Sequence, residues 1–324
     1  MKLVVCFDGT WNEASTHTNV WKFKEDLDCS DDADTRATYI EGIGTVAGDQ
    51  LISGLFAADF KRPLGLGYRW LVRNILNAAG KEEIRIYLFG FSRGGYLAHT
   101  LSWLLSEVGV PRKFADALPI AEAYADKEDI AALEELKKGG VMPSPRIEML
   151  GLWDAVTSPN DIYKGYHDGE RAPKVGRIYH ALATDERRKL FEAMRYQAGE
   201  GIFQRWFSGV HKDVGGGYPE NECELSNVTL DWMKRNAIEC DLKFKTSPKE
   251  CGGGHDFSSL TKIHNEETAL DPIENRVYHE GEIIDDSVRD RVKTQLGYFP
   301  SISKIPIELV NWLKSFGWRD KSEG

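Results

Sequence analysis

The chain has 324 residues, of which 41% are hydrophobic and 28% are charged, and its formal net charge is -10. This composition is that of a soluble globular protein, and no apolar run approaches the ~18 residues that a transmembrane helix needs. The acidic balance argues against a broad phosphate-binding surface, so we expect no nucleic acid partner.

The cysteine pattern and the N-terminal residues indicate the cellular compartment in which the protein is found. The cysteines are odd in number, lie far apart and form no CxxC pair, which argues against a disulfide framework and against a zinc knuckle. They are Cys6, Cys29, Cys223, Cys240 and Cys251. Met1 leads straight into a short apolar run, without the hydrophobic region of a signal peptide. We therefore expect a cytoplasmic location, with secretion that needs no signal peptide left open.

Apolar runs of strand length alternate with helical patterns along the chain. Residues 3–7, 84–89 and 147–152 are short and unalternating, as in buried parallel strands, and 203–207 is a fourth candidate. Helical spacing of apolar residues occurs at 67–79, 93–107, 115–138, 185–196 and 225–237. The alternation predicts an α/β fold of the α/β-hydrolase kind, a doubly wound, mostly parallel sheet with helices on both faces. The length fits one domain, residues 1–324.

Two polar segments and one amphipathic segment do not fit this alternation of strands and helices. Residues 25–34 are acidic and predict a solvated loop. Residues 219–290 are polar and predict an irregular cap or C-terminal elaboration. Residues 305–316 form an amphipathic helix pattern, which more often packs on the body of a protein than on a membrane.

The strongest chemical signal is a serine between a predicted strand and a predicted helix. Residues 90–94 read GFSRG, which fits the nucleophile turn of hydrolases. Gly90 and Gly94 suit this turn, because a Cβ on either side of Ser92 would collide with adjacent backbone. The amide of Arg93 begins the helix and could donate to a developing oxyanion.

A serine hydroxyl needs a base and an acid, and in this fold they follow the serine in the order Asp or Glu, then His. Asp154 comes directly after the predicted strand 147–152, where it could orient an imidazole; its alternative is a turn or helix-cap residue. His211 lies on a glycine-rich loop after the strand 203–207 and is the preferred base. His180 is its main rival and could equally be a core or capping residue.

Two further loops could support this site. Gly9 and Thr10 follow the first strand, where a loop can donate the second amide of an oxyanion hole. Asp8 is expected to hold this loop through hydrogen bonds to backbone amides; phosphoryl transfer from Asp8 is disfavoured because a second aspartate is missing two residues away. Asp213 could order the loop of His211, and the glycines at 215–217 could form a simple turn.

Several stretches together resemble one family, the uncharacterised-domain 2235 group, which includes the catalytic domain of Tle1-like phospholipase effectors of type VI secretion. The resemblance is carried by residues 5–12, 39–45, 87–96, 151–156, 180–188 and 209–218. It implies an α/β-hydrolase fold with a catalytic core at about 1–235. It also implies a Ser-Asp-His triad that cleaves acyl esters, typically of phospholipids, and the matching positions are Ser92, Asp154 and His211.

These observations predict a serine hydrolase that acts on carboxylic esters of lipids through an acyl-enzyme, without a metal or an organic cofactor. The expected partners are a lipid or small ester substrate, a membrane surface contacted transiently, and an immunity protein if the chain is an effector. The alternatives are a cytoplasmic esterase for non-lipid substrates and a non-catalytic binding protein of the same fold.

Overall fold

The computed structural model describes residues 1–42, 44, 55–78, 83–126, 130–157, 169–249, 262–268, 272–295 and 298–316. In this part of the chain the centre is a seven-stranded sheet in the order β2-β1-β3-β6-β7-β8-β9. Each neighbouring pair in it is parallel. The strands are β1 (Lys2–Phe7), β2 (Thr35–Ile40), β3 (Arg85–Phe91), β6 (Arg146–Trp153), β7 (Val175–Ala183), β8 (Ile202–Phe207) and β9 (Ile283–Ile284). A separate antiparallel pair consists of β4 (Val110–Pro111) and β5 (Val141–Met142).

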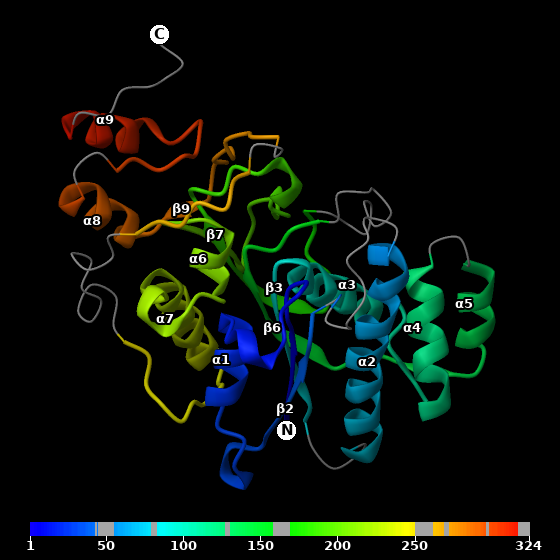
Figure 1. Cartoon of the computed structure of the whole chain (residues 1–324). Helices are drawn as coiled ribbons and strands as arrows, with labels where there is room; N and C mark the ends of the chain where they lie inside the picture. The colour runs from blue at the N-terminus through cyan, green and yellow to red at the C-terminus, as the bar shows by residue number, and fades with distance from the viewer. Residues whose placement is uncertain are drawn as a thin grey trace.

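Helices cover both faces of the sheet. They are α1 (Asn19–Asp26), α2 (Leu55–Ala78), α3 (Arg93–Glu107), α4 (Ala117–Ala125), α5 (Ile130–Lys137), α6 (His211–Gly215), α7 (Glu224–Glu239), α8 (Asp286–Thr294) and α9 (Ile307–Ser315). Figure 1 shows α2 to α5 on one side of the sheet and α1 with α7 on the other. None of the described helices combines the length and the apolar character that crossing a bilayer would require.

The two faces explain why the strand sequences are apolar without alternation. In β1, Leu3 and Val5 belong to the core that includes α2 and α3, whereas Val4 and Cys6 belong to the core that includes α1 and α7. A strand buried on both sides needs apolar residues at every position. The prediction of a doubly wound α/β fold is therefore confirmed.

The order in which strands are added to the sheet reverses at β1, because β2 lies on one side of β1 and β3 lies on the other. Parallel sheets place their ligand sites outside the carboxyl ends of the strands at such a switch point. Asp8 follows β1 and Ser92 follows β3 at this position. The topology thus brings the two predicted loops to the same edge of the sheet.

Some predicted elements differ from the structure. The predicted helix at 185–196 is wrong, because the segment is irregular and contains only a 3-10 turn at Lys189–Phe191. Its backbone instead bonds to neighbours, as when the Met194 amide donates to the Ala155 carbonyl. The predicted helix at 115–138 is divided into α4 and α5, and the helix predicted at 67–79 begins at Leu55.

The polar segments are only partly as expected. The first two residues of the predicted acidic loop at 25–34 end α1, and a 3-10 turn follows at Asp31–Ala33. The segment at 219–290 contains α7, as predicted within it, and the start of α8. Of the residues between these two helices, those described are mostly irregular, with only the short β9 at the sheet edge. Residues 262–268 and 272–285 lie near the carboxyl ends of β7 and β8, so an irregular elaboration covers that end of the sheet (Figure 1). Residues 240–249 lie at the opposite end, where Asp241 pairs with Lys2 and Arg85.

Candidate active site

Ser92 lies on a strained turn between β3 and α3. Its φ is 57° and its ψ is -130°, a backbone conformation that residues with a side chain rarely adopt. Such strain persists only where the surroundings fix it, and it is common at functional sites. Ser92 is 4% exposed, so its hydroxyl is held in a nearly dry environment.

The glycines beside Ser92 are required by close approach of backbone. A Cβ at Gly90 would lie 2.3 Å from the Gly94 carbonyl oxygen. A Cβ at Gly94 would lie 2.3 Å from the Phe7 carbonyl oxygen and 2.4 Å from that of Asp8. The structure therefore packs the start of α3 directly against the end of β1, which is the close packing that the motif predicted.

His211 is the first residue of α6 and faces Ser92. Its Nε2 lies 2.8 Å from Ser92 Oγ, and its Nδ1 lies 2.7 Å from Asp154 Oδ2. The imidazole is also held by rings on both sides, with Phe91 and Phe191 centroids 4.7 and 4.9 Å away. The structure brings the three side chains predicted from the sequence into one hydrogen-bonded relay.

Asp154 is fully buried directly after β6 and adopts a φ of 39°. It accepts hydrogen bonds from the Ala183 amide, at 3.0 Å, and from two nitrogens of Arg276, at 2.5 and 2.9 Å. Burial alone would raise the pKa of Asp154, but the Arg276 guanidinium and the hydrogen bond with His211 hold that pKa well below its usual range. Asp154 is therefore an ionised carboxylate whose position is fixed by several donors.

Sequence reasoning missed Arg276. This residue lies in an irregular polar stretch without periodicity, and 122 positions separate it from Asp154. No local pattern marks such a residue, because its partner becomes visible only when the chain has folded. Its side chain is 8% exposed, so it belongs to the interior of the site rather than to the surface.

His180, the rival base, lies in the middle layer of the protein on β7. It is fully buried, and its Nε2 accepts a hydrogen bond from the Ala155 amide at 3.0 Å. Burial lowers its pKa to about 3, so the ring is neutral. In the described part of the chain its ring forms no hydrogen bond with Ser92 or Asp154, so His180 is a core residue that supports the turn after Asp154.

The loop after β1 lies against Ser92, and Gly9 and Thr10, the two oxyanion donors predicted in this loop, differ in their hydrogen bonding. The Gly9 amide donates to Asp8 Oδ1 at 2.7 Å, so this amide is already engaged. Thr10 is buried, and its hydroxyl has no hydrogen-bond partner among the described residues. For the amides of Thr10 and of Arg93, at the start of α3, the role in an oxyanion hole stays a prediction. Burial lowers the pKa of the Arg93 guanidinium to about 10.

Asp8 holds its loop as predicted for a structural residue, but largely through hydroxyls. Its Oδ2 accepts from Thr18 Oγ1 at 2.5 Å and from the Tyr39 hydroxyl at 2.6 Å. Burial raises the pKa of Asp8 to about 6, although these bonds act in the opposite direction. Among the residues that the structure describes, Gly9 supplies the one backbone amide that donates to Asp8.

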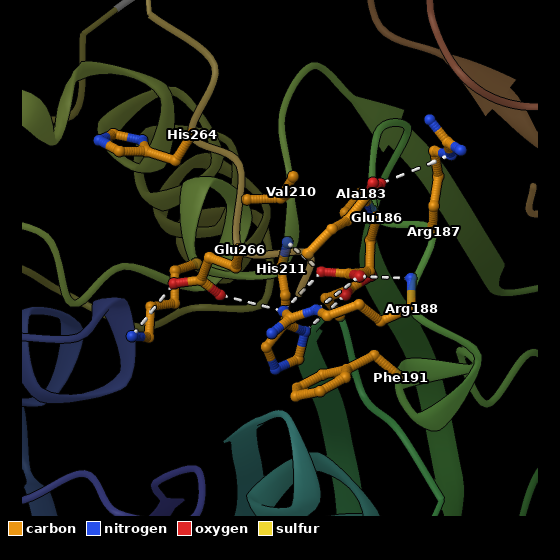
Figure 2. Close-up of polar contacts among 12 residues, drawn as sticks. Ala183, Glu186, Arg187, Arg188, Phe191, Val210, His211, His264 and Glu266 are labelled. Carbon is orange, nitrogen blue, oxygen red and sulfur yellow. Dashed lines mark hydrogen bonds and ion pairs between the residues drawn. The ribbon is translucent and has the colours of Figure 1, made fainter. Parts of the chain in front are cut away.

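A group of charged residues, among them Glu186, Arg188 and Glu266, lies beside His211 (Figure 2). Glu186 accepts the backbone N–H of His211 at 3.3 Å and forms an ion pair with Arg188 at 2.8 Å. Arg188 also pairs with Glu266 at 3.0 Å, which connects this layer to the C-terminal part of the chain. The loop of His211 is anchored through Asp213, whose Oδ1 lies 2.6 Å from His264 Nδ1. Asp213 thus orders the loop, as the sequence suggested.

Comparison with known proteins gives a family match and distant structural likenesses. The family described as "T6SS, Phospholipase effector Tle1-like, catalytic domain" matches residues 1–236. The uncharacterized protein YEL023C of Saccharomyces cerevisiae is 24% identical over 223 residues, which are 59% of this chain and 32% of that protein. The chain thus spans about a third of the length of this curated relative.

Two solved structures resemble the chain at 18% sequence identity. One is a crystal structure of an uncharacterized protein from Pseudomonas aeruginosa, with a TM-score of 0.47 over 76% of this chain and 46% of that chain. The other is the Tle1 effector bound to the VgrG spike of the type 6 secretion system, with a TM-score of 0.43 over 67% of this chain and 51% of that chain.

Proposed function

This chain belongs to the family of Tle1-like catalytic domains of phospholipase effectors, and from that premise we propose that it is a serine hydrolase that cleaves carboxylic ester bonds of lipids. The observation that carries the proposal is the relay from Ser92 Oγ through His211 to Asp154, with spacings of 2.8 and 2.7 Å. A serine activated by an imidazole, which is itself oriented by a carboxylate, is the arrangement that acyl transfer requires.

The proposed reaction has two steps. His211 Nε2 accepts the proton of Ser92 Oγ while this oxygen attacks the ester carbonyl, and the imidazolium then donates that proton to the departing alcohol. Water attacks the acyl-enzyme with His211 again as the base, which releases the fatty acid and restores Ser92. Amides at Arg93 and Thr10 would stabilise the negative oxygen of both tetrahedral intermediates.

Family membership favours a lipid as the substrate over a small ester. The relay alone supports either, because it acts on the ester carbonyl and not on the alcohol. A phospholipid substrate would also require transient contact with a membrane surface. If the chain acts as a secreted effector, an immunity protein is a further partner to expect.

The test uses vesicles of phosphatidylethanolamine and phosphatidylglycerol, with products identified by mass spectrometry. We expect the wild type to release fatty acid and lysophospholipid, and Ser92→Ala to lose at least about 10³-fold of this rate. The matched control is Ser102→Ala, because Ser102 is a buried serine on the same helix, α3, and donates to the His99 carbonyl. Labelling by a fluorophosphonate should disappear in the first variant and persist in the second.

Three outcomes would contradict parts of the proposal. Equal labelling and turnover in Ser92→Ala would remove Ser92 as the nucleophile. Hydrolysis of a p-nitrophenyl ester without hydrolysis of vesicles would make the protein an esterase for non-lipid substrates. Failure of the wild type to react with the fluorophosphonate would favour a non-catalytic binding protein.

A further inference from the structure

A guanidinium from the C-terminal part of the chain lies directly behind the relay. We infer that Arg276 is a positioning residue of the reaction proposed above: it clamps both oxygens of Asp154 and thereby fixes the direction from which this carboxylate meets His211. This inference rests on the proposed function. Residue 276 lies beyond residues 1–236, which are the part of the chain that matches the family.

The clamp is bidentate, and it accounts for the orientation of the carboxylate. Arg276 Nη1 donates to Asp154 Oδ1 at 2.5 Å, and Nη2 donates to Oδ2 at 2.9 Å. Two parallel bonds from a planar guanidinium fix the plane of a carboxylate, whereas a single donor would let it rotate. The oxygen that receives Nη2 is the one that lies 2.7 Å from His211 Nδ1. Arg276 therefore sets the direction from which Asp154 meets the imidazole.

Arg276 is itself held in place on the core of the protein. Nη1 donates to the Ala183 carbonyl at 3.1 Å, and Nη2 donates to the Phe191 carbonyl at 2.5 Å. The first carbonyl ends β7, and the second belongs to the segment whose ring contacts His211. A guanidinium with four hydrogen bonds and little exposure is preorganised, and this is what a positioning group in an active site needs.

The experiment compares Arg276→Gln and Arg276→Lys in the full chain, on hydrolysis of a p-nitrophenyl ester at neutral pH. Glutamine keeps a donor but removes the charge, and lysine keeps the charge but removes the bidentate geometry. Because neither side chain can fix both oxygens of Asp154, we expect kcat of both variants to fall about 10- to 100-fold with little change in KM.

A control variant separates this role from a merely structural one. Arg195→Gln breaks tethers to the same C-terminal stretch, because Arg195 bonds to the Val277 carbonyl and to Glu282 but not to Asp154. It should lower the thermal midpoint without lowering kcat. If Arg276→Gln gave the same result as this control, with kcat unchanged, the positioning role would be overturned. If Arg276→Gln did not fold, the lysine variant would decide: unchanged kcat would overturn the role.

A spectroscopic reading keeps this test separate from the proposed function. The NMR signal of the proton between His211 Nδ1 and Asp154 Oδ2, identified by its absence in His211→Gln, can be observed without any substrate. This signal should shift or disappear in Arg276→Gln relative to the wild type, even if the protein proved to lack hydrolase activity. An unchanged signal would refute the positioning of Asp154 by Arg276, whereas absent turnover in the wild type would refute only the proposed function.

Discussion

Replacing Gly94 by alanine tests how tightly the nucleophile turn is packed. A Cβ at this position would lie 2.3 and 2.4 Å from two main-chain carbonyl oxygens at the end of β1. No side-chain rotation can relieve contact with main-chain atoms, and ordinary contact begins near 3.4 Å. The start of α3 and the end of β1 must therefore separate by about 1 Å.

The expected cost follows from this separation. Overpacking of a rigid site costs about 1–3 kcal/mol, which exceeds the gain of up to about 1 kcal/mol from replacing a helical glycine by alanine. We expect Gly94→Ala to lower the free energy of unfolding by about 2 kcal/mol. Displacement of the Ser92 turn by about 1 Å should also reduce kcat about 100-fold if the relay is catalytic.

Urea unfolding followed by circular dichroism measures the first effect, and hydrolysis of a p-nitrophenyl ester measures the second. The matched control is Gly65→Ala in α2, where a Cβ would meet only the tip of the Leu118 side chain, at 2.6 Å. The Leu118 side chain is half-buried and can move. The free energy of unfolding of Gly65→Ala should therefore stay within about 1 kcal/mol of the wild-type value. If Gly94→Ala matched the control in both stability and turnover, the close approach of α3 to β1 would be refuted.

Two more variants test individual side chains. Folding raises the pKa of Asp8 from 3.8 to about 6, so the stability that this group contributes is complete below about pH 4 and is lost as the pH rises through 6. In urea unfolding, the free energy of unfolding of the wild type should therefore fall by about 1–3 kcal/mol relative to that of Asp8→Asn between pH 4 and 7. Parallel pH profiles of the two proteins would contradict this. His180→Gln keeps an acceptor for the Ala155 amide and should retain ester hydrolysis within about tenfold, whereas His211→Gln should lose at least about 10³-fold. The reverse ranking would move the base to His180.

The central strands could be predicted from the sequence because burial on both faces produces continuous apolar runs. This pattern found β1, β3, β6 and β8 within two residues of their ends. It missed β7, although this strand is central, because Gly176, Arg177 and His180 interrupt its apolar run. Some of its polar groups are satisfied by tertiary contacts, such as the bond from the Ala155 amide to His180 Nε2, which no window of sequence contains.

The candidate site, too, was predicted from the sequence only in part. Ser92, Asp154 and His211 each follow a recognisable strand, so the rule that parallel strands end at one edge of the sheet was enough to bring them together. The Gly9 amide was assigned to the oxyanion on loop position alone, and the side chain of Asp8 takes it instead. Local chemistry between neighbours in the chain decided this detail, and a strand pattern carries no information about it.

The two segments where sequence patterns failed lie side by side near the same imidazole, because the Lys189 amide donates to the Pro272 carbonyl and the Glu274 amide to the Arg187 carbonyl. The segment at 185–196 does not form a helix; its residues Asp185 and Glu186 instead bond to the backbone of the His211 loop, at Gly209 and at His211 itself. The irregular segment around Arg276 is ordered by bonds to Asp154 and to backbone carbonyls of the core. In both cases, the contacts that order the segment also orient the relay. Variants that remove these bonds should therefore lower stability and turnover together, whereas Arg195→Gln, which removes none of them, should lower stability alone.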